Sequence, residues 1–256
     1  MNSIAITALF TLSRKEVVRI LRIWSQTILP PSITMTLYFV IFGNLIGQRI
    51  GQMDGFDYMS FIVPGLVMMS VITNSYGNIV SSFFGAKFSK HIEEMLISPM
   101  PNYVILFGHV LGALVRGLLV GSIVTIIALF FTEINIHNIW IVLSTVVLTS
   151  IVFALAGFIN ACLATKFDDI AIIPAFVLTP LIYLGGVFYS ISLLPEFWQT
   201  VSKFNPVLYM VNAFRYGFLG VSDVNIYLAY AIILSFLLIL TTICLYMLNK
   251  GIGLRN

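Results

Sequence analysis

The chain has 256 residues, of which 59% are hydrophobic and 9% are charged. Soluble domains average about 25% charged residues, and so few ionisable groups cannot cover a soluble surface. The net charge of +3 is also too small to indicate nucleic-acid binding. The composition therefore excludes an ordinary soluble enzyme and predicts one all-α integral membrane domain over residues 1–256.

Residues 8–24 predict an amphipathic helix lying in the membrane interface. The apolar face of this helix holds Phe10, Val17, Ile20, Leu21 and Trp24. Lys15, Arg19 and Arg22 lie opposite, where their charges would meet anionic lipid. A soluble helix packed on a partner is the alternative interpretation.

Six apolar segments are long enough to span a membrane, since a spanning helix needs about 20 apolar residues. They cover residues 26–47, 58–84, 102–131, 139–165, 170–190 and 226–248. Prolines and glycines interrupt the fifth segment, as a hinge or a plain kink. A stripe of small residues in the fourth, from Ser150 through Gly157 to Ala164, indicates close helix packing.

The basic residues predict the orientation of these segments. With six spans both chain ends face one side, which carries nine basic residues: Arg14, Lys15, Arg19, Arg22, Lys87, Lys90, Lys166, Lys250 and Arg255. The other side carries three: Arg49, Lys203 and Arg215. Because cytoplasmic loops carry an excess of lysine and arginine, both termini are expected to be cytoplasmic.

Residues 191–225 would then lie outside, but their pattern is not that of an ordinary loop. Ser192 is expected to cap a short amphipathic helix that Asn205-Pro206 ends, and Val207 to Leu219 is an apolar piece too short to span. Two short apolar helices between spans predict a re-entrant or interfacial hairpin.

The loop at 85–101 predicts a short amphipathic helix on the cytoplasmic side. Its apolar side holds Phe88, Ile92, Met95 and Leu96, and its carboxylates are Glu93 and Glu94. Such a helix is suited to docking into the groove of a soluble partner, although a solvated charge cluster that only sets topology has the same pattern.

Catalytic signatures are absent from the sequence. It has no GxxxxGK[ST] loop for ATP phosphates, no HExxH, no GxSxG and no Cys/His cluster with metal spacing. We therefore expect no catalytic residue, no metal site, no cofactor bound by this chain and no ATP hydrolysis by it.

Several segments resemble the ABC-type-2 export permeases. The run from Ile92 to Pro99 is similar to the coupling-helix region of that family. Other runs resemble its C-terminal signature: Phe167 to Ile170, Pro174, Leu181 to Tyr189, Asn205 to Val207 and Phe214 to Gly217.

The resemblance implies a six-span exporter permease in the bacterial inner membrane. It would pair with a second copy of itself and with two separate ATPase subunits, which would bind ATP and Mg²⁺. The coupling-helix residues Phe88, Ile92, Glu93, Glu94, Met95 and Leu96 would transmit ATPase closure to the spans. Apart from these subunits, the expected partner is membrane lipid.

Polar residues inside the spans are candidates for the transport path. The candidates are Asn74, Asn78, Ser81, His109 and Arg116. The polar face of the second span either lines a path or forms hydrogen bonds between helices. Arg116 either lines the path, pairs with a carboxylate, or reaches toward an interface from a long offset helix.

Aromatic residues around the 191–225 segment are candidates for an outer gate. These are Phe188, Tyr189, Phe197, Trp198 and Phe214. Two other functions stay open beside the exporter: a transporter or channel driven by an ion gradient, and an intramembrane enzyme. The first would normally place carboxylates within its spans, and the second needs a catalytic set.

Overall fold

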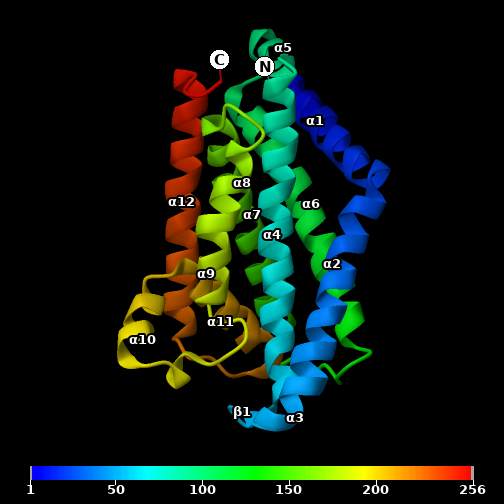
Figure 1. The fold of residues 1–256 in the computed structure, drawn as a ribbon. Coiled ribbons are helices and arrows are strands. Elements are labelled where there is room, and N and C mark those ends of the chain that lie inside the picture. Colours follow the sequence, from blue (N-terminus) through cyan, green and yellow to red (C-terminus); the bar gives the residue numbers. More distant parts are fainter. Residues whose placement is uncertain (1, 255–256) are drawn as a thin grey trace.

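The computed structural model describes residues 2–254 as a bundle of helices (Figure 1). The first half contains α1 (Asn2–Arg22), α2 (Trp24–Tyr38), a π-helical stretch (Phe39–Ile46), α3 (Gly47–Ile50), β1 (Gln52–Met53), β2 (Phe56–Asp57), α4 (Tyr58–Phe88) and α5 (His91–Ile97). The second half contains α6 (Asn102–Ala128), α7 (Ile139–Leu163), α8 (Asp169–Ile173), a π-helical stretch (Pro174–Leu178), α9 (Thr179–Tyr183), a 3₁₀ turn (Ile191–Leu193), α10 (Glu196–Lys203), α11 (Pro206–Leu219) and α12 (Ile226–Lys250).

Helix α4 is the central element and packs most extensively against α6 and α7. Small residues allow these helices to approach closely. A Cβ added at Gly117 of α6 would overlap the hydroxyl of Ser75, and one at Gly157 of α7 would lie 2.7 Å from the carbonyl oxygen of Tyr76. The small-residue stripe from Ser150 to Ala164 is buried, which confirms its predicted packing role.

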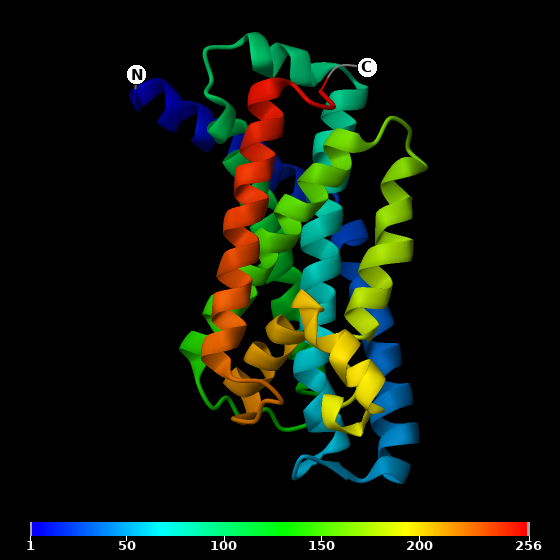
Figure 2. The same cartoon turned by 90° about the vertical axis from the view of Figure 1, so that its left-hand side faces the viewer.

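The bundle has two distinct ends. The start of α1, the end of α12 and helix α5 lie together at one end, here called the α5 end (Figures 1 and 2). Helices α3 and α10 and the strands lie at the other, the α10 end. Arg255, counted above with the basic residues of the first group, lies outside the described residues.

Within residues 2–254, five helices are long and apolar enough to cross a membrane: Trp24–Ile50, Tyr58–Phe88, Asn102–Ala128, Ile139–Leu163 and Ile226–Lys250. The predicted fifth segment, 170–190, is shorter in the structure, where Asp169–Tyr183 forms an apolar helix. The helix ends there because Gly186 adopts a φ of +73°, which turns the chain away from the helical path. At 1.5 Å per residue this helix is about 22 Å long.

A two-stranded ribbon corrects the all-α prediction at the α10 end. Strand β1 pairs antiparallel with β2, with Met53 opposite Phe56. Asp54 and Gly55 make the turn between them with φ values of 51° and 83°. An Asp-Gly pair favours this kind of hairpin turn, so the signal was present in the sequence.

The 191–225 segment forms two helices, as predicted, but the first begins later than Ser192. Pro195 precedes Glu196 with an extended ψ of 148°, and the helix α10 starts only after it. Asn205 caps α11 by accepting a hydrogen bond from the backbone nitrogen of Val207 (3.0 Å). Helix α11 is almost entirely buried against α4, α7 and α12, whereas α10 is largely exposed.

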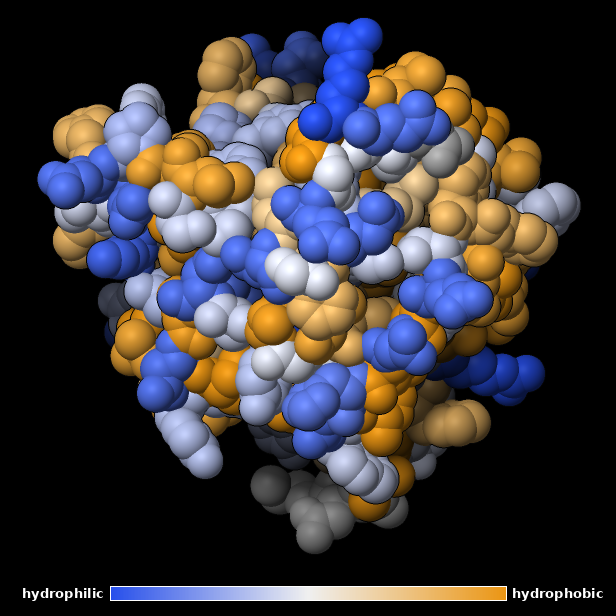
Figure 3. Space-filling view, turned by 90° about the horizontal axis from the view of Figure 1, so that it is seen from below, coloured by the Kyte–Doolittle hydropathy of each residue, from blue (hydrophilic) through white to orange (hydrophobic). Residues whose placement is uncertain are grey.

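The α10 end presents a mixed surface. In Figure 3, which views the bundle from this end, hydrophilic residues are spread over the face and hydrophobic residues lie between and around them. Phe197 of α10 is 69% exposed and Phe204, which follows it, is 85% exposed. This end therefore combines solvent-facing polar groups with uncovered aromatic rings.

Helix α1 begins earlier than residue 8 and docks obliquely along α6. The predicted apolar face is wrong in part, because Ile20 turns inward with Leu12 and Glu16. Phe10 and Leu21 stay exposed, at 66% and 57%. The buried stripe runs along the edge between the predicted apolar and basic faces, so α1 docks by that edge and leaves its apolar face uncovered.

Candidate functional site

Helix α5 lies across the α5 end and is held there by the apolar side chains of its inner face. Ile92 is 1% exposed, and Met95 and Leu96 pack against a core cluster built by α4, α6, α7 and α12. Glu93 and Glu94 are exposed on the outer side. The sequence placed these five residues correctly on one helix, but Phe88, predicted on the same helix, is the last residue of α4.

The prediction that the apolar stripe of this helix is free for a partner is wrong for Ile92, and Met95 and Leu96 are only partly exposed. Helix α4 continues to Phe88, so only Ser89 and Lys90 connect it to α5. This connection is too short to hold α5 away from the bundle. Ile97, which the sequence analysis did not select, is 86% exposed. The exposed residues of α5 are therefore His91, the two carboxylates and Ile97.

Phe88 extends this outer surface at the end of α4. Its side chain is 55% exposed, and its ring centroid lies 4.7 Å from that of Phe167 in an edge contact. Phe84 lies below both rings, 5.1 Å from Phe167. The aromatic trio joins α4 to the α7–α8 turn beside α5.

A polar strip on α4 is left uncovered by the rest of the chain. The α4 strip consists of Thr73, Asn74, Gly77 and Ser81, which are exposed or half-buried on this otherwise buried helix. A Cβ at Gly77 would meet nothing within 4 Å. In Figure 1 this helix is drawn between α2 and the α8–α9 segment. Asn74 and Ser81 thus occupy an open position, as a path would require.

Asn78 and His109 lie elsewhere, in a buried polar cluster that α1 completes. Arg19 Nη2 donates to Asn78 Oδ1 at 2.8 Å, and its guanidinium contacts Glu16 Oε2 at 3.1 Å. Ser82 Oγ donates to the same carboxylate oxygen at 2.7 Å. We call Glu16, Arg19, Asn78, Ser82 and His109 the α1 cluster.

Arg116 is half-buried one heptad beyond His109 on α6. Its Nε is buried and has no hydrogen-bond partner among the described residues. Asn102, at the start of the same helix, instead donates to Asn249 Oδ1 of α12 at 2.9 Å. Asn102, His109 and Arg116, each seven residues apart on α6, therefore lie in three different environments and do not form one continuous lining.

The predicted gate residues divide between an aromatic cluster and other sites. Phe188 lies 4.9 Å from Phe42, 5.7 Å from Tyr38 and 5.8 Å from Tyr183, measured between ring centroids. The hydroxyls of Tyr38 and Tyr183 are 3.2 Å apart, so this cluster joins α2 to α9. Tyr189 donates to the carbonyl of Tyr183 at 3.0 Å.

The other three predicted gate residues do not join this cluster. Phe197 and Trp198 contact one another on α10, with centroids 5.3 Å apart, and are largely exposed. Phe214 is 1% exposed in the core, where its ring packs on Phe218.

Arg215 of α11 contacts residues from three other segments at the α10 end. The guanidinium is 1% exposed, lies 4.0 Å from the ring centroid of Phe61, and donates to the carbonyl of Gly186 at 2.6 Å. It also lies 4.0 Å from Asp223 Oδ2. Asp223 in turn accepts a hydrogen bond from Ser190 Oγ at 2.6 Å.

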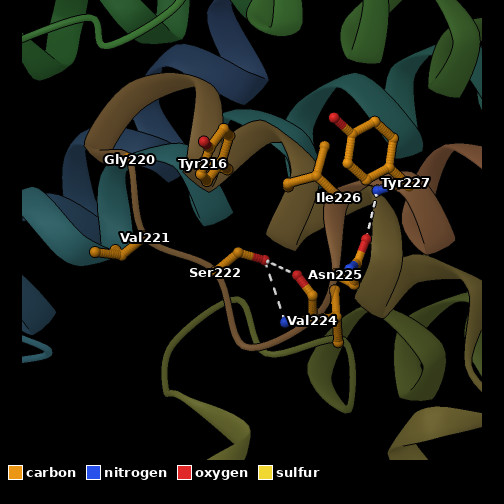
Figure 4. A pocket seen from close by; sticks show the side chains of 8 residues that line it. All are labelled: Tyr216, Gly220, Val221, Ser222, Val224, Asn225, Ile226 and Tyr227. Atoms are coloured by element: carbon orange, nitrogen blue, oxygen red, sulfur yellow. Dashed lines mark hydrogen bonds between the residues drawn. The ribbon is translucent and has the colours of Figure 1, made fainter.

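An open groove of about 510 Å³ lies where the chain passes from α11 to α12 (Figure 4). Two of its polar side chains bond to the local backbone: Ser222 Oγ donates to the carbonyl of Val224 at 2.8 Å, and Asn225 Oδ1 caps α12 by accepting from the nitrogen of Tyr227. These groups hold the turn, and we assign the groove no ligand.

Comparison with known proteins identifies the family. The ABC-2 type transporter model matches residues 7–219. The chain is 55% identical over 249 residues to the inner membrane transport permease YadH of Escherichia coli K12, covering 97% of each chain. The chain belongs to the ABC-2 type transporter family.

More distant relatives include nodulation protein J. The protein of Rhizobium leguminosarum bv. viciae is 22% identical over 204 residues, or 79% of each chain. That of Sinorhizobium fredii NGR234 is 25% identical over 171 residues, covering 66% of this chain and 65% of the relative. The family model, over residues 7–219, covers most of α1 and the elements from α2 to α11.

For this ABC-2 chain, sequence reasoning missed the burial of three charged residues: Glu16, Lys87 and Arg215. Lys87 was counted only as a basic residue of the cytoplasmic side, but its Nζ donates to the carbonyls of Cys162 and Ala164. Glu16 sits among basic residues, which suggested a solvated face, but its i, i+4 spacing from Leu12 and to Ile20 was a signal for a buried stripe. Arg215 was counted only as a basic residue of the outer side. No local pattern indicates its contacts, because Phe61, Gly186 and Asp223 come from three separate segments.

Proposed function

We propose that this chain is the permease subunit of an ATP-driven exporter in a bacterial inner membrane. ATP and Mg²⁺ would bind to a separate ATPase, present in two copies. Family membership supports this, as does the similarity to a relative named as an inner membrane transport permease. The observation that carries the proposal is α5, a short helix with an outward face of Glu93, Glu94 and Ile97.

The proposed topology has six spans and places the α5 end in the cytoplasm. The five long helices and Asp169–Tyr183 supply the passes. A hydrocarbon core is about 30 Å thick, so the shorter helix needs the following turn, residues 184–190, or a locally thinner membrane to complete its pass. The exposed apolar face of α1 would lie in the interface, and the buried α11 would re-enter from outside.

The docking surface for the ATPase is proposed to be the outer face of α5 with Phe88. Ile97 and Phe88 offer exposed apolar area, which drives association when buried. Glu93 and Glu94 would orient the partner, since charges at an interface give specificity more than affinity. Ile92, Met95 and Leu96 would transmit movement, because they join α5 to the core helices.

A second copy of the chain is proposed to cover the face formed by α2, the α4 strip and α8–α9. Polar groups such as Thr73 and Ser81 would be poorly placed against lipid, and Phe176, between α8 and α9, is 77% exposed. Two α4 strips facing one another would line the path, with the Tyr38, Phe42, Tyr183 and Phe188 cluster as its outer gate. This assigns Asn74 and Ser81 to the path.

Cysteine cross-linking tests the second copy. A cysteine at Phe176 should link two chains in native membranes, whereas one at Leu238, which is 65% exposed on α12, should not. The native Cys162 and Cys244 are buried and serve as the silent background. Equal cross-linking at both positions would contradict the proposed dimer face.

Gradient-driven transport remains the second candidate because one observation favours it. Glu16 places a carboxylate, 0% exposed, against two long helices, and buried acids of this kind are typical of ion-coupled transporters. Substrate export from vesicles decides between the two. Export that needs ATP and the ATPase and survives an ionophore supports the exporter. Export that proceeds without ATP and collapses with the ionophore contradicts it.

A further inference from the structure

The α1 cluster contains two buried groups that face each other without a bond. Glu16 Oε1 of α1 and His109 Nε2 of α6 are 4.0 Å apart. The residues are 0% and 1% exposed, and neither atom has a hydrogen-bond partner among the described residues. Unpaired buried polar atoms are rare in folded proteins, so this pair calls for a ligand.

The hydrogen bond made by the other ring nitrogen determines which kind of group can lie between Glu16 Oε1 and His109 Nε2. His109 Nδ1 lies 2.8 Å from the carbonyl oxygen of Ile105. A carbonyl only accepts, so Nδ1 must carry a proton. In the neutral ring Nε2 is then a bare acceptor, and it faces a carboxylate oxygen that is also an acceptor. Two acceptors in a buried site repel each other unless a donor lies between them.

We propose that Glu16 and His109 form a binding site for one proton. The proton comes from water at the α5 end and bonds to the Nε2 lone pair, which converts the ring to an imidazolium. The new N–H then donates to Glu16 Oε1, and a closing movement of about 1 Å gives a charge-assisted hydrogen bond of ordinary length. This site goes beyond the proposed function, since it does not depend on the ATPase.

The surroundings of the ring determine how readily it takes the proton. Burial of the ring is the largest influence and opposes its charged form. The charged groups that act on it come from α1: Glu16 favours the proton, and Lys15 and Arg19 oppose it. Helix α4 contributes the uncharged ring of Phe83, in edge contact at 5.4 Å. Arg19 is already held by Asn78 and by the other carboxylate oxygen, which leaves Oε1 directed at His109.

Proton binding would change how α1 is held. Without the proton, Glu16 joins α1 to α4 through Ser82 and has no bond to α6. With it, the same carboxylate bridges α4 and α6. Because α1 leads directly into α2 after a break at Ile23, the proton would bias the position of the first long helix.

Nitrogen NMR of His109 in the full-length chain tests the site. The chain has three histidines, so His91→Gln and His137→Gln leave His109 as the sole signal. The ¹⁵N shifts distinguish the neutral Nδ1–H ring from the imidazolium between pH 5 and 9. The proposal expects a one-proton transition, and Glu16→Gln should lower the ratio of imidazolium to neutral ring about tenfold or more at each pH.

Matched variants make the result decisive. Glu93→Gln removes an exposed carboxylate on α5 and should leave the His109 titration unchanged. Glu16→Asp keeps the charge and should lie between the native chain and the Gln variant, which gives a comparison even if Glu16→Gln does not fold. A ring that stays neutral throughout means that water alone fills the gap, and this overturns the proposal. Equal titration in the native chain and both Glu16 variants also overturns it.

Discussion

Alanine at Ile97 or at Ile92 distinguishes the two proposed roles of α5, which are binding the ATPase and packing on the core of its own chain. Ile97 is 86% exposed, and full burial of an isoleucine side chain against a partner contributes roughly 1.5–3 kcal/mol. Ile97→Ala should therefore weaken ATPase binding by about 10- to 150-fold. It should leave the free energy of unfolding nearly unchanged, because the side chain touches little of its own chain.

Ile92→Ala should have the opposite profile. Ile92 is 1% exposed, and an isoleucine-to-alanine change in a core costs about 2–5 kcal/mol. The thermal stability of the permease should fall, while the folded fraction should bind the ATPase with affinity close to native. For the same reason, replacing Met95 and Leu96 by aspartate would damage the core as well as any docking.

The assay is a titration of the purified ATPase onto the permease in lipid nanodiscs, with thermal unfolding measured on the same samples. Ile50→Ala is the matched control, since Ile50 is 43% exposed at the α10 end. Weaker binding with Ile92→Ala but not with Ile97→Ala would refute the assignment of the outer face. Equal loss with Ile50→Ala would show that the effect is not local.

Two further predictions concern topology and packing. An impermeant thiol reagent applied to intact cells should label a cysteine at Thr200 but not one at Ser89, and reversed labelling would end the proposed orientation. Gly65→Ala should destabilise the chain by about 1–3 kcal/mol, because the added Cβ would overlap the carbonyl oxygen of Val187. Gly77→Ala, where the Cβ meets nothing within 4 Å, should stabilise α4 by about 0.5–1 kcal/mol, and thermal unfolding compares the two.

The long helices were predictable because hydropathy over some 20 residues is a local signal. Residues 58–84 and 102–131 became α4 and α6 with ends shifted by a few residues. The caps Asn205 and Asn225 are equally local, since each accepts from a nitrogen two residues on. The length of the fifth segment was overestimated because its sequence stays apolar beyond Tyr183, whereas the backbone turns at Gly186.

The sequence predicted the candidate site only where its residues lie together on a single helix. Glu93 and Glu94 could be placed on one short helix, but the direction of Ile92 depends on how α5 meets a core built by four other helices. Asn78 and Ser81 looked equivalent on the second span, yet one meets Arg19 and the other is exposed. Periodicity gives the faces of a helix, and only tertiary packing decides which neighbour each face meets.

The most direct test of the exporter is ATP hydrolysis by the complex purified from native membranes through a tag on this chain. The account predicts that a vanadate-sensitive ATPase accompanies the tagged chain, and that Ile97→Asp removes this activity while the chain still elutes as a folded membrane protein. Preparations of native chain without ATP hydrolysis, or with activity that Ile97→Asp leaves intact, would contradict it.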